Sequence, residues 1–457
     1  MNKIFIISIL LSTMNVQAMT EQDFVGHLRA THPFFKQQTL SSEIKQVEKQ
    51  ATTANEDWIV AVDGTYQSEK NAKNASAVYD SLNTTSIGIS TTKKHVATGS
   101  NITLKHTWAD KSKDINSTRN QFSVDYAYPL LRNKDGINDR LSGDVAQIAI
   151  SKNRLERLEA EESFIAKKLV RFVDLAYAQA QQKINKRRLM LAKKELALVK
   201  EKYAASVVDK VDVLLQKDAH QKANQQYLQA QQELVLLRHE IAIMLNLDFE
   251  KAVADIDLYA IYSPKSIILK AYLSENARIL KINDLAKRTL KRQLRSFKNQ
   301  SKAKLNLNLG LNSAGENTNY SNSIDHQSTT WKVGFDLSYP LGGVESNSNI
   351  TKVTIQLASL AQSKQEQLLN IYTQAKTGKE KIQLLKEILV SNEVQIDIAK
   401  ARTAEEKQRY ANGNGQASFV INAQNNEQVV ELNYAQTAKN YQKAVFEFKA
   451  TIDQLVL

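Results

Sequence analysis

Glycine and proline are scarce in this chain, and their scarcity limits the folds that it can adopt. The 457 residues include 14 Gly and 4 Pro, whereas average usage would give about 32 and about 23. No Gly lies between Gly143 and Gly310, and Pro264 is the only Pro in that interval. Folds that turn every ten residues or so need many more of these residues. The composition disfavours a β-sandwich, a β/α barrel and a Gly-rich dinucleotide-binding sheet, and it favours long helices.

The N-terminal residues have the pattern of a secretory signal peptide. Lys3 is a short positive region, Ile4 to Leu11 is apolar, and Val16-Gln17-Ala18 is a small-x-small cleavage site. The apolar run is too short to span a membrane as a helix. We therefore expect residues 1–18 to be a cleaved export signal; the alternative is an ordinary buried first helix.

The chain contains no Cys. This excludes disulfides, thiol chemistry, thiolate metal sites and a lipid-modified N-terminal Cys. After the signal, no stretch approaches the run of about 18 apolar residues that a transmembrane helix requires. Any membrane span would therefore have to be a β-barrel.

Matching landmarks indicate that the chain is a tandem repeat. The landmarks that match in order are Pro33 with Pro264, Pro129 with Pro340, Tyr203 with Tyr410, and Tyr227 with Tyr434. We predict a first repeat over 19–250 and a second over 251–457. Each repeat is expected to begin with a helix, at about 34–56 and about 264–300, and to continue with strands and a helical hairpin.

Alternating apolar and polar residues predict six strands, four within about 57–129 and two within about 304–340. In 121–128, for example, Phe122, Val124 and Tyr126 alternate with Gln121, Ser123 and Asp125. A membrane barrel requires strands of this kind, with aromatic residues at their ends. The alternative is a one-sided antiparallel sheet on a soluble core. The signal peptide and the aromatic strand ends favour a barrel, which several chains would have to share.

Apolar residues at 3-4 spacing predict long helical hairpins at 140–247 and 345–456. The clearest stripe is Tyr227, Ala230, Leu234, Leu237 and Ile241. A helix over 140–203 would extend on the order of 90 Å. Because only a narrow stripe is apolar, such helices normally pack as coiled coils with neighbours.

On these features the sequence resembles the TolC-type outer-membrane efflux and secretion channels, over nearly the whole chain after the signal. The most specific elements are Tyr128-Pro129-Leu130 and Tyr339-Pro340-Leu341, which are similar to the family's strand-to-helix turns. Proline ends a strand because it cannot donate a ladder hydrogen bond. The resemblance implies a mainly α fold with a membrane β-barrel, in which a trimeric α-barrel continues into a shared β-barrel.

The break between the long helices also resembles the family, whose pattern is a Tyr, a Gly three residues later, and Asp-Val nine and ten residues later. The matching positions are Tyr203, Ser206, Asp212 and Val213 in the first break, and Tyr410, Gly413, Phe419 and Val420 in the second. Gly413 and Gly415 suit a tight turn. The resemblance implies a periplasmic tip where the channel narrows and an adaptor docks. The alternative is a plain turn without a partner.

The sequence departs from the family in several places. Phe419 and Asn422 stand where some members have acidic residues around the aperture, and Gly415 stands where a gating Arg can occur. The first repeat has extra sequence between Tyr66 and Asn120 with two further strand-like runs, whereas the family usually contributes four strands per protomer and twelve per trimer. Which of the six strands enter the barrel is left open, because two of them could form an extracellular hairpin.

The resemblance implies a passive exit duct of a tripartite efflux pump or a type I secretion system. Its partners would be two further copies of the chain, outer-membrane lipid, a periplasmic adaptor (membrane fusion) protein and an inner-membrane ABC or proton-driven transporter. Its place would be the outer membrane of a two-membrane bacterium, extending into the periplasm. The alternatives are a periplasmic coiled-coil adaptor and a structural envelope protein. Two hairpins and amphipathic strands fit neither of them.

No catalytic constellation is apparent, so we expect no enzyme activity, cofactor or metal site. The seven His are scattered without metal-ligand spacing, and no phosphate-binding or nucleophile motif occurs. The stretch 281–304 carries nine Lys and Arg against the single acid Asp284. A nucleic-acid patch is disfavoured in an exported protein. The stretch is interpreted as a solvated helix face or as the border of a duct that favours anionic cargo.

Overall fold

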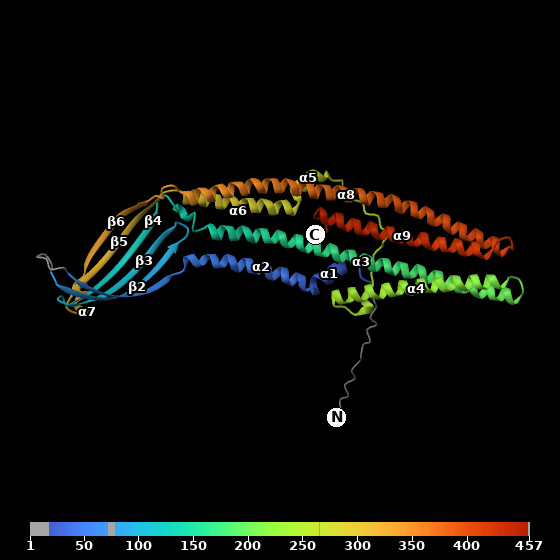
Figure 1. Ribbon diagram of the computed structural model, residues 1–457, viewed down its shortest axis with the longest axis horizontal. Helices are drawn as coiled ribbons and strands as arrows, with labels where there is room; N and C mark the ends of the chain where they lie inside the picture. Colours follow the sequence, from blue (N-terminus) through green and yellow to red (C-terminus); the bar gives the residue numbers. More distant parts are fainter. Residues whose placement is uncertain (1–17, 72–77, 265, 456–457) are drawn as a thin grey trace, which may run out of the picture. The chain divides into compact units, whose positions relative to one another are not determined.

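The computed structural model describes residues 18–71, 78–264 and 266–455 (Figure 1). The chain divides into two compact units. The helical unit comprises Met1–Thr39, Arg157–Leu280 and Glu366–Leu457, and the sheet unit comprises Leu40–Glu156 and Lys281–Gln365. Each unit takes segments from both predicted repeats, and the division into repeats stays a prediction. Residues 1–17 of the predicted signal peptide lie outside the described residues.

The sheet unit contains one antiparallel sheet of six strands, which lie side by side in chain order (Figure 1). Their bounds are β1 (Ile59–Lys70), β2 (Ser81–His95), β3 (Ser100–Lys113), β4 (Ser117–Pro129), β5 (Lys304–Asn317) and β6 (Ser328–Ser338). Each of the six segments with a period of two lies in one of these strands. The prediction of six strands is therefore confirmed.

The two faces of the sheet differ in polarity. One row of paired residues crosses all six strands and is almost wholly apolar: Val60, Thr91, Leu104, Val124, Leu311 and Trp331. The next row points to the opposite face and is mostly polar: Ala61, Ser90, Lys105, Ser123, Asn312 and Thr330. We call these the apolar face and the polar face. The apolar face is open, since Val60 is 67% exposed and Trp331 is 76% exposed, so it is not packed on a core as in a soluble one-sided sheet.

Parts of four helices accompany the sheet in the same unit. They belong to α2 (Pro33–Ala51), α3 (Leu141–Ala204), α6 (Arg278–Gln300) and α8 (Val344–Ala411). Neighbours are linked by Lys49 with Gln147, by Arg292 with Asp144 at 2.6 Å, and by Lys364 with Asp284 at 2.6 Å. The helices therefore lie in the order α2, α3, α6, α8. In the chain, α2 precedes β1, α3 follows β4, α6 precedes β5 and α8 follows β6, so the helices have the same order as these strands in the sheet.

Basic residues form an exposed stripe on α6. Lys281, Arg288, Lys291, Arg295 and Lys298 are exposed. Lys281 lies two turns before Arg288, and the other four follow one another at helical 3-4 spacing. Arg292 instead donates to Asp144 and to the carbonyl of Ile137. The expectation of a solvated charged face is consistent with this exposure, and a role in anionic cargo stays a prediction.

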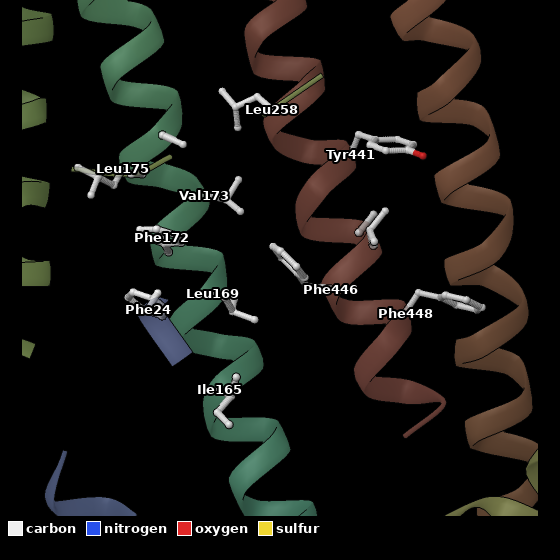
Figure 2. Packing of buried hydrophobic residues seen from close by; sticks show 14 of the residues in the cluster. Phe24, Ile165, Leu169, Phe172, Val173, Leu175, Leu258, Tyr441, Phe446 and Phe448 are labelled. Carbon is white, nitrogen blue, oxygen red and sulfur yellow. The ribbon is translucent and has the colours of Figure 1, made fainter. Parts of the chain in front are cut away.

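The helical unit combines α1 (Glu21–Thr31), α4 (Lys210–Leu245), α5 (Leu269–Asn276) and α9 (Ala417–Thr451) with the remaining parts of α2, α3, α6 and α8. Its core joins segments distant in sequence: the rings of Phe24 and Phe172 stack with centroids 4.4 Å apart. Figure 2 shows Leu169 and Val173 of α3 facing Phe446 of α9. The apolar stripes at 3-4 spacing thus form the seams between the long helices.

The helices expected at the start of each repeat need correction. The first prediction, about 34–56, covers α2 but ends in a short 3-10 helix over Thr52–Glu56, and α1 before Pro33 was not predicted. The second, about 264–300, begins later, because Ile268 has an extended backbone, and it is interrupted at Ala277 between α5 and α6. The Asp453 carboxylate accepts the amide of Arg278 at 2.7 Å and so caps the start of α6, which the local sequence does not reveal.

A short helix, α7, lies against the sheet. α7 (Tyr320–Asp325) lies between β5 and β6 and packs on β4 and β5, where Asn120 donates to Ser323. Among the described residues, no helix combines the length and apolar character needed to cross a membrane.

Candidate functional site

The first helical hairpin turns between α3 and α4. The amide of Ser206 donates to the carbonyl of Tyr203 at 2.9 Å, and the amide of Val207 donates to that of Lys202 at 2.9 Å. These two bonds define a Schellman motif, which satisfies the last carbonyls of a helix. α3 therefore ends in a rigid, hydrogen-bonded turn.

The second hairpin, between α8 and α9, turns in the same way. The amide of Gly413 donates to the carbonyl of Tyr410 at 3.2 Å, and the amide of Asn414 donates to that of Arg409 at 3.0 Å. Ser206 and Gly413 occupy equivalent left-handed positions, with φ of 58° and 78°. A left-handed backbone costs a residue with a Cβ roughly 1–2 kcal/mol, so the first turn is strained where the second is relaxed. The Gly415 position is restricted by contact, because a Cβ there would lie 2.9 Å from the amide nitrogen of Tyr410.

An open recess of about 610 Å³ lies between the two turns. Tyr410 is central to it, with the Lys202 ammonium 4.7 Å from the centre of its ring. Burial and then the Asp212 carboxylate raise the pKa of Tyr410 above its ordinary value. The hydroxyl therefore stays protonated, and its oxygen is buried. The polar groups that the recess offers to a partner are the Lys202 ammonium and the Asp212 carboxylate.

The strand-to-helix turns differ from each other in how firmly they are held. Pro129 ends β4, and the next amide, that of Leu130, donates to the carbonyl of Leu305 at 2.7 Å. Pro340 follows β6, and Leu341 after it is 94% exposed. The first turn is fixed to a neighbouring strand, while the second lies at the open edge of the sheet.

Solved structures of outer-membrane channels share this fold, although no family model and no curated protein matches the sequence. The outer-membrane channel OprN aligns over 94% of this chain and 89% of its own, with 16% identity and a TM-score of 0.67. VceC of Vibrio cholerae aligns over 94% and 95%, with 11% identity and a TM-score of 0.65. The open-state MtrE channel of Neisseria gonorrhoeae aligns over 95% and 89%, with 11% identity and a TM-score of 0.68.

This chain has the TolC-type channel fold. The resemblance seen in the sequence is confirmed at the level of the fold, and the match spans most of each channel protomer.

Within this TolC-type fold, the predicted tip residues fall into four groups. Ser206, Asp212, Tyr410, Gly413 and Gly415 line the recess. The side chains of Tyr203, Val213 and Phe419 are exposed or half-buried at the turns, and Asn422 lines a groove between α4 and α9. Val420 is only 4% exposed, so it packs inside the hairpin pair and cannot face a partner.

A set of polar contacts between α3 and α9 escaped the sequence interpretation. We call it the polar ladder: Asn185, Arg187, Arg188 and Glu195 of α3 with Gln424, Asn425, Gln428 and Glu431 of α9. Gln428 donates to Asn185 at 2.6 Å, and Arg188 donates to Asn425 at 2.9 Å. Arg187 pairs with Glu431, and Gln424 donates to Glu195. The two hairpins are thus joined near the tip by directional polar bonds where an apolar seam would be usual.

Burial makes these polar contacts consequential. Asn185, Arg188 and Gln424 are each at most 5% exposed. Burial lowers the pKa of Arg188, while Glu195 and then Glu427 raise it; an arginine nevertheless keeps its charge in a protein. Leaving one such group unpaired costs about 1–3 kcal/mol. The sequence did contain a signal for these contacts. Gln424, Gln428 and Glu431 follow one another at the 3-4 spacing of residues that face a neighbouring helix, and polar residues buried there require hydrogen-bond partners.

An ion cluster around the buried Glu162 lies farther from the turns. Glu159, Glu162 and Asp453 place carboxylate oxygens within 4.8 Å of one another, an arrangement that could hold a metal ion. Arg278 already supplies the positive charge, because its guanidinium pairs with all three carboxylates. The cluster joins α3, the start of α6 and the end of α9, and we interpret it as structural.

Proposed function

We propose that this chain is the protomer of a homotrimeric outer-membrane channel that acts as a passive exit duct. The observation that carries the proposal is the sheet, with its open apolar face, opposite polar face and two unpaired edges. A wall of this kind fits lipid on one side and water on the other. Residues 1–18 would direct export, as the sequence predicts.

The open edges of the sheet support sharing between copies. β1 and β6 each pair with a single neighbour, and almost all of their residues are exposed. A membrane does not tolerate unpaired strand edges. Because the six strands alternate in direction, β6 of one copy would run antiparallel to β1 of the next. We infer that the copies close into one barrel, and three copies is the number that the TolC-type resemblance implies.

The hairpin turns support docking of a partner to the helical unit. The recess between Ser206 and Gly413 is open and polar, and rigid Schellman turns hold its walls. We propose that a periplasmic adaptor binds there and links the duct to an inner-membrane ABC or proton-driven transporter. The system would be an efflux pump or a type I secretion system. Energy would come from the transporter, because the chain itself is proposed to have no enzyme activity.

Crosslinking between the edge strands tests this assembly. Because the natural chain has no Cys, only introduced cysteines can react. We would combine Val62→Cys on β1 with Trp331→Cys, Val333→Cys or Phe335→Cys on β6, all on the apolar face. For at least one pair we expect covalent dimers and trimers and nothing larger, because three copies close the ring.

A matched control lies inside the sheet. Val124→Cys with Leu311→Cys joins facing residues of β4 and β5 and should give a disulfide within one chain. If this control forms while no edge pair links two chains, the shared barrel is wrong. A ladder extending beyond trimers would also contradict it, because it indicates an open assembly.

A further inference from the structure

We propose that all six strands of each chain enter the membrane wall, so that the closed trimer has eighteen strands. This inference rests on the proposed function, since it concerns how the shared barrel is built. The question is decided by β2 and β3, which could form either part of the wall or a hairpin above the membrane.

The first observation is that β2 and β3 run the full height of the sheet. β2 pairs with β1 from Ile59–Thr92 to Lys70–Ser81 without interruption. β3 pairs with β4 from Asn101–Ala127 to Lys111–Ser117. A hairpin that projected above the membrane would leave β1 to pair directly with β4. Instead, β2 and β3 separate β1 from β4 along their whole length.

The second observation is that the turn between β2 and β3, over residues 96–99, is fixed at the junction where β4 leads into α3. Lys94 pairs with Asp139 at 2.6 Å, just before α3 begins. Gly99 and Gly136 have left-handed backbones, and a Cβ on Gly136 would lie 1.7 Å from the carbonyl oxygen of Val96. The turn therefore packs tightly at the same end of the sheet as Pro129. The hairpin begins where the other strands begin.

The third observation is that the apolar face continues across the hairpin. Ile89 of β2 and His106 of β3 lie in one row with Phe122 of β4, and the rings of His106 and Phe122 stack with centroids 4.1 Å apart. Ile87 and Ile89 are 48% and 52% exposed. In an extracellular hairpin these two isoleucines, on the side that continues the apolar face, would be exposed to water, which is unfavourable for apolar side chains. In a membrane wall, lipid covers them.

Eighteen strands also match the proposed ring of helices in circumference. Each sheet unit brings four helices in a row, and twelve helices spaced by about 8–10 Å need roughly 100–120 Å. Strands about 4.8 Å apart, tilted by about 40°, occupy roughly 113 Å for eighteen and roughly 75 Å for twelve. The wider wall continues the helix ring without narrowing. The exit would then be roughly 36 Å across between backbones, against roughly 24 Å for twelve strands.

Cysteine labelling can place the hairpin inside or outside the membrane. We would make Ile89→Cys and Leu104→Cys on the apolar face, and Ser90→Cys and Thr107→Cys on the polar face, and treat outer-membrane vesicles with a charged, membrane-impermeant maleimide. Ile87→Cys with Ser86→Cys is a second pair should one variant fold poorly. We expect the polar-face cysteines to react at least about tenfold faster, because lipid shields the apolar face.

A reference pair on β5 separates this inference from the proposed function. Leu309→Cys and Asn308→Cys lie on the apolar and polar faces of a strand outside the hairpin. Suppose that the polar-face cysteine of β5 reacts faster than its apolar-face cysteine, while the β2 and β3 cysteines react equally fast on both faces. The hairpin is then outside the membrane, and the eighteen-strand wall is wrong. If the two β5 cysteines also react equally fast, the sheet is not a membrane wall and the proposed function fails.

Discussion

Replacing Arg278 with Met is expected to lower the free energy of unfolding of the helical unit by about 3–5 kcal/mol, the cost of breaking a buried ion pair from one side. The guanidinium lies 3.3 Å from Glu159 and 3.0 Å from Asp453, and it also pairs with Glu162. Glu162 is 2% exposed, so water cannot replace the lost charge. The measurement is thermal or denaturant unfolding of the purified protein, followed by helical circular dichroism.

The destabilisation should depend on pH in a defined direction. Burial and then Asp453 raise the pKa of Glu159, while Arg278 lowers it; without Arg278 the folded-state pKa rises further above its unfolded value. A group with a raised folded-state pKa stabilises the fold at low pH and loses that contribution as the pH rises through the folded-state pKa. The deficit of the Met variant should therefore be smaller near about pH 5 than near about pH 8.

Two control variants identify the cause of the loss. Arg278→Lys keeps a positive charge and should recover part of the stability. Adding Glu162→Gln to the Met variant removes one buried charge and should also recover part of it. If Arg278→Met unfolds like the wild type, or if its deficit is the same at both pH values, the ion cluster does not stabilise the unit as described.

Replacing Leu309 with Arg is expected to abolish stable insertion of the sheet into the outer membrane. Leu309 lies in the interior of β5 on the apolar face, paired with Tyr126 and Val333. An arginine on the lipid-facing side of a membrane strand costs about 2–4 kcal/mol at mid-depth, and a trimer would carry three of them. The measurement is the amount of trimer in the outer-membrane fraction.

The neighbouring residue supplies the matched control. Asn308 points to the polar face, where its amide donates to Asp336 at 2.8 Å. An arginine at position 308 can still donate to that carboxylate and brings a positive charge beside it, so Asn308→Arg should leave trimer yield near the wild-type level. Equal trimer yields from the two variants would contradict the proposal that the apolar face contacts lipid and the polar face contacts water.

The strands and long helices were predictable because their patterns are local. A period of two placed all six strands, and 3-4 spacing together with the absence of Gly anticipated α3 and α4. The hairpin turns were predictable too, since Gly413 takes the left-handed position that glycine favours. Ser206 was found at the equivalent position only through its spacing from Tyr203, because a serine carries no such preference.

The unpredicted features depend on residues far apart in the chain. Glu162 interrupts an apolar stripe of α3, and the reason is Arg278, more than a hundred residues later. The polar ladder joins Asn185 to Gln428, which are 243 residues apart in the chain. In the sequence such residues appear only as polar interruptions of an apolar helical stripe. Only the packing of α3 against α6 and α9 shows that each has a partner.

Cell fractionation followed by electrophoresis without heating tests the central claim most directly. A channel built as proposed should be recovered in the outer membrane, and in detergent it should migrate as a complex of three chains that heating converts to single chains. An adaptor or a structural envelope protein has no reason to form such a complex in that membrane. Recovery of the chain as a soluble periplasmic monomer would contradict the account.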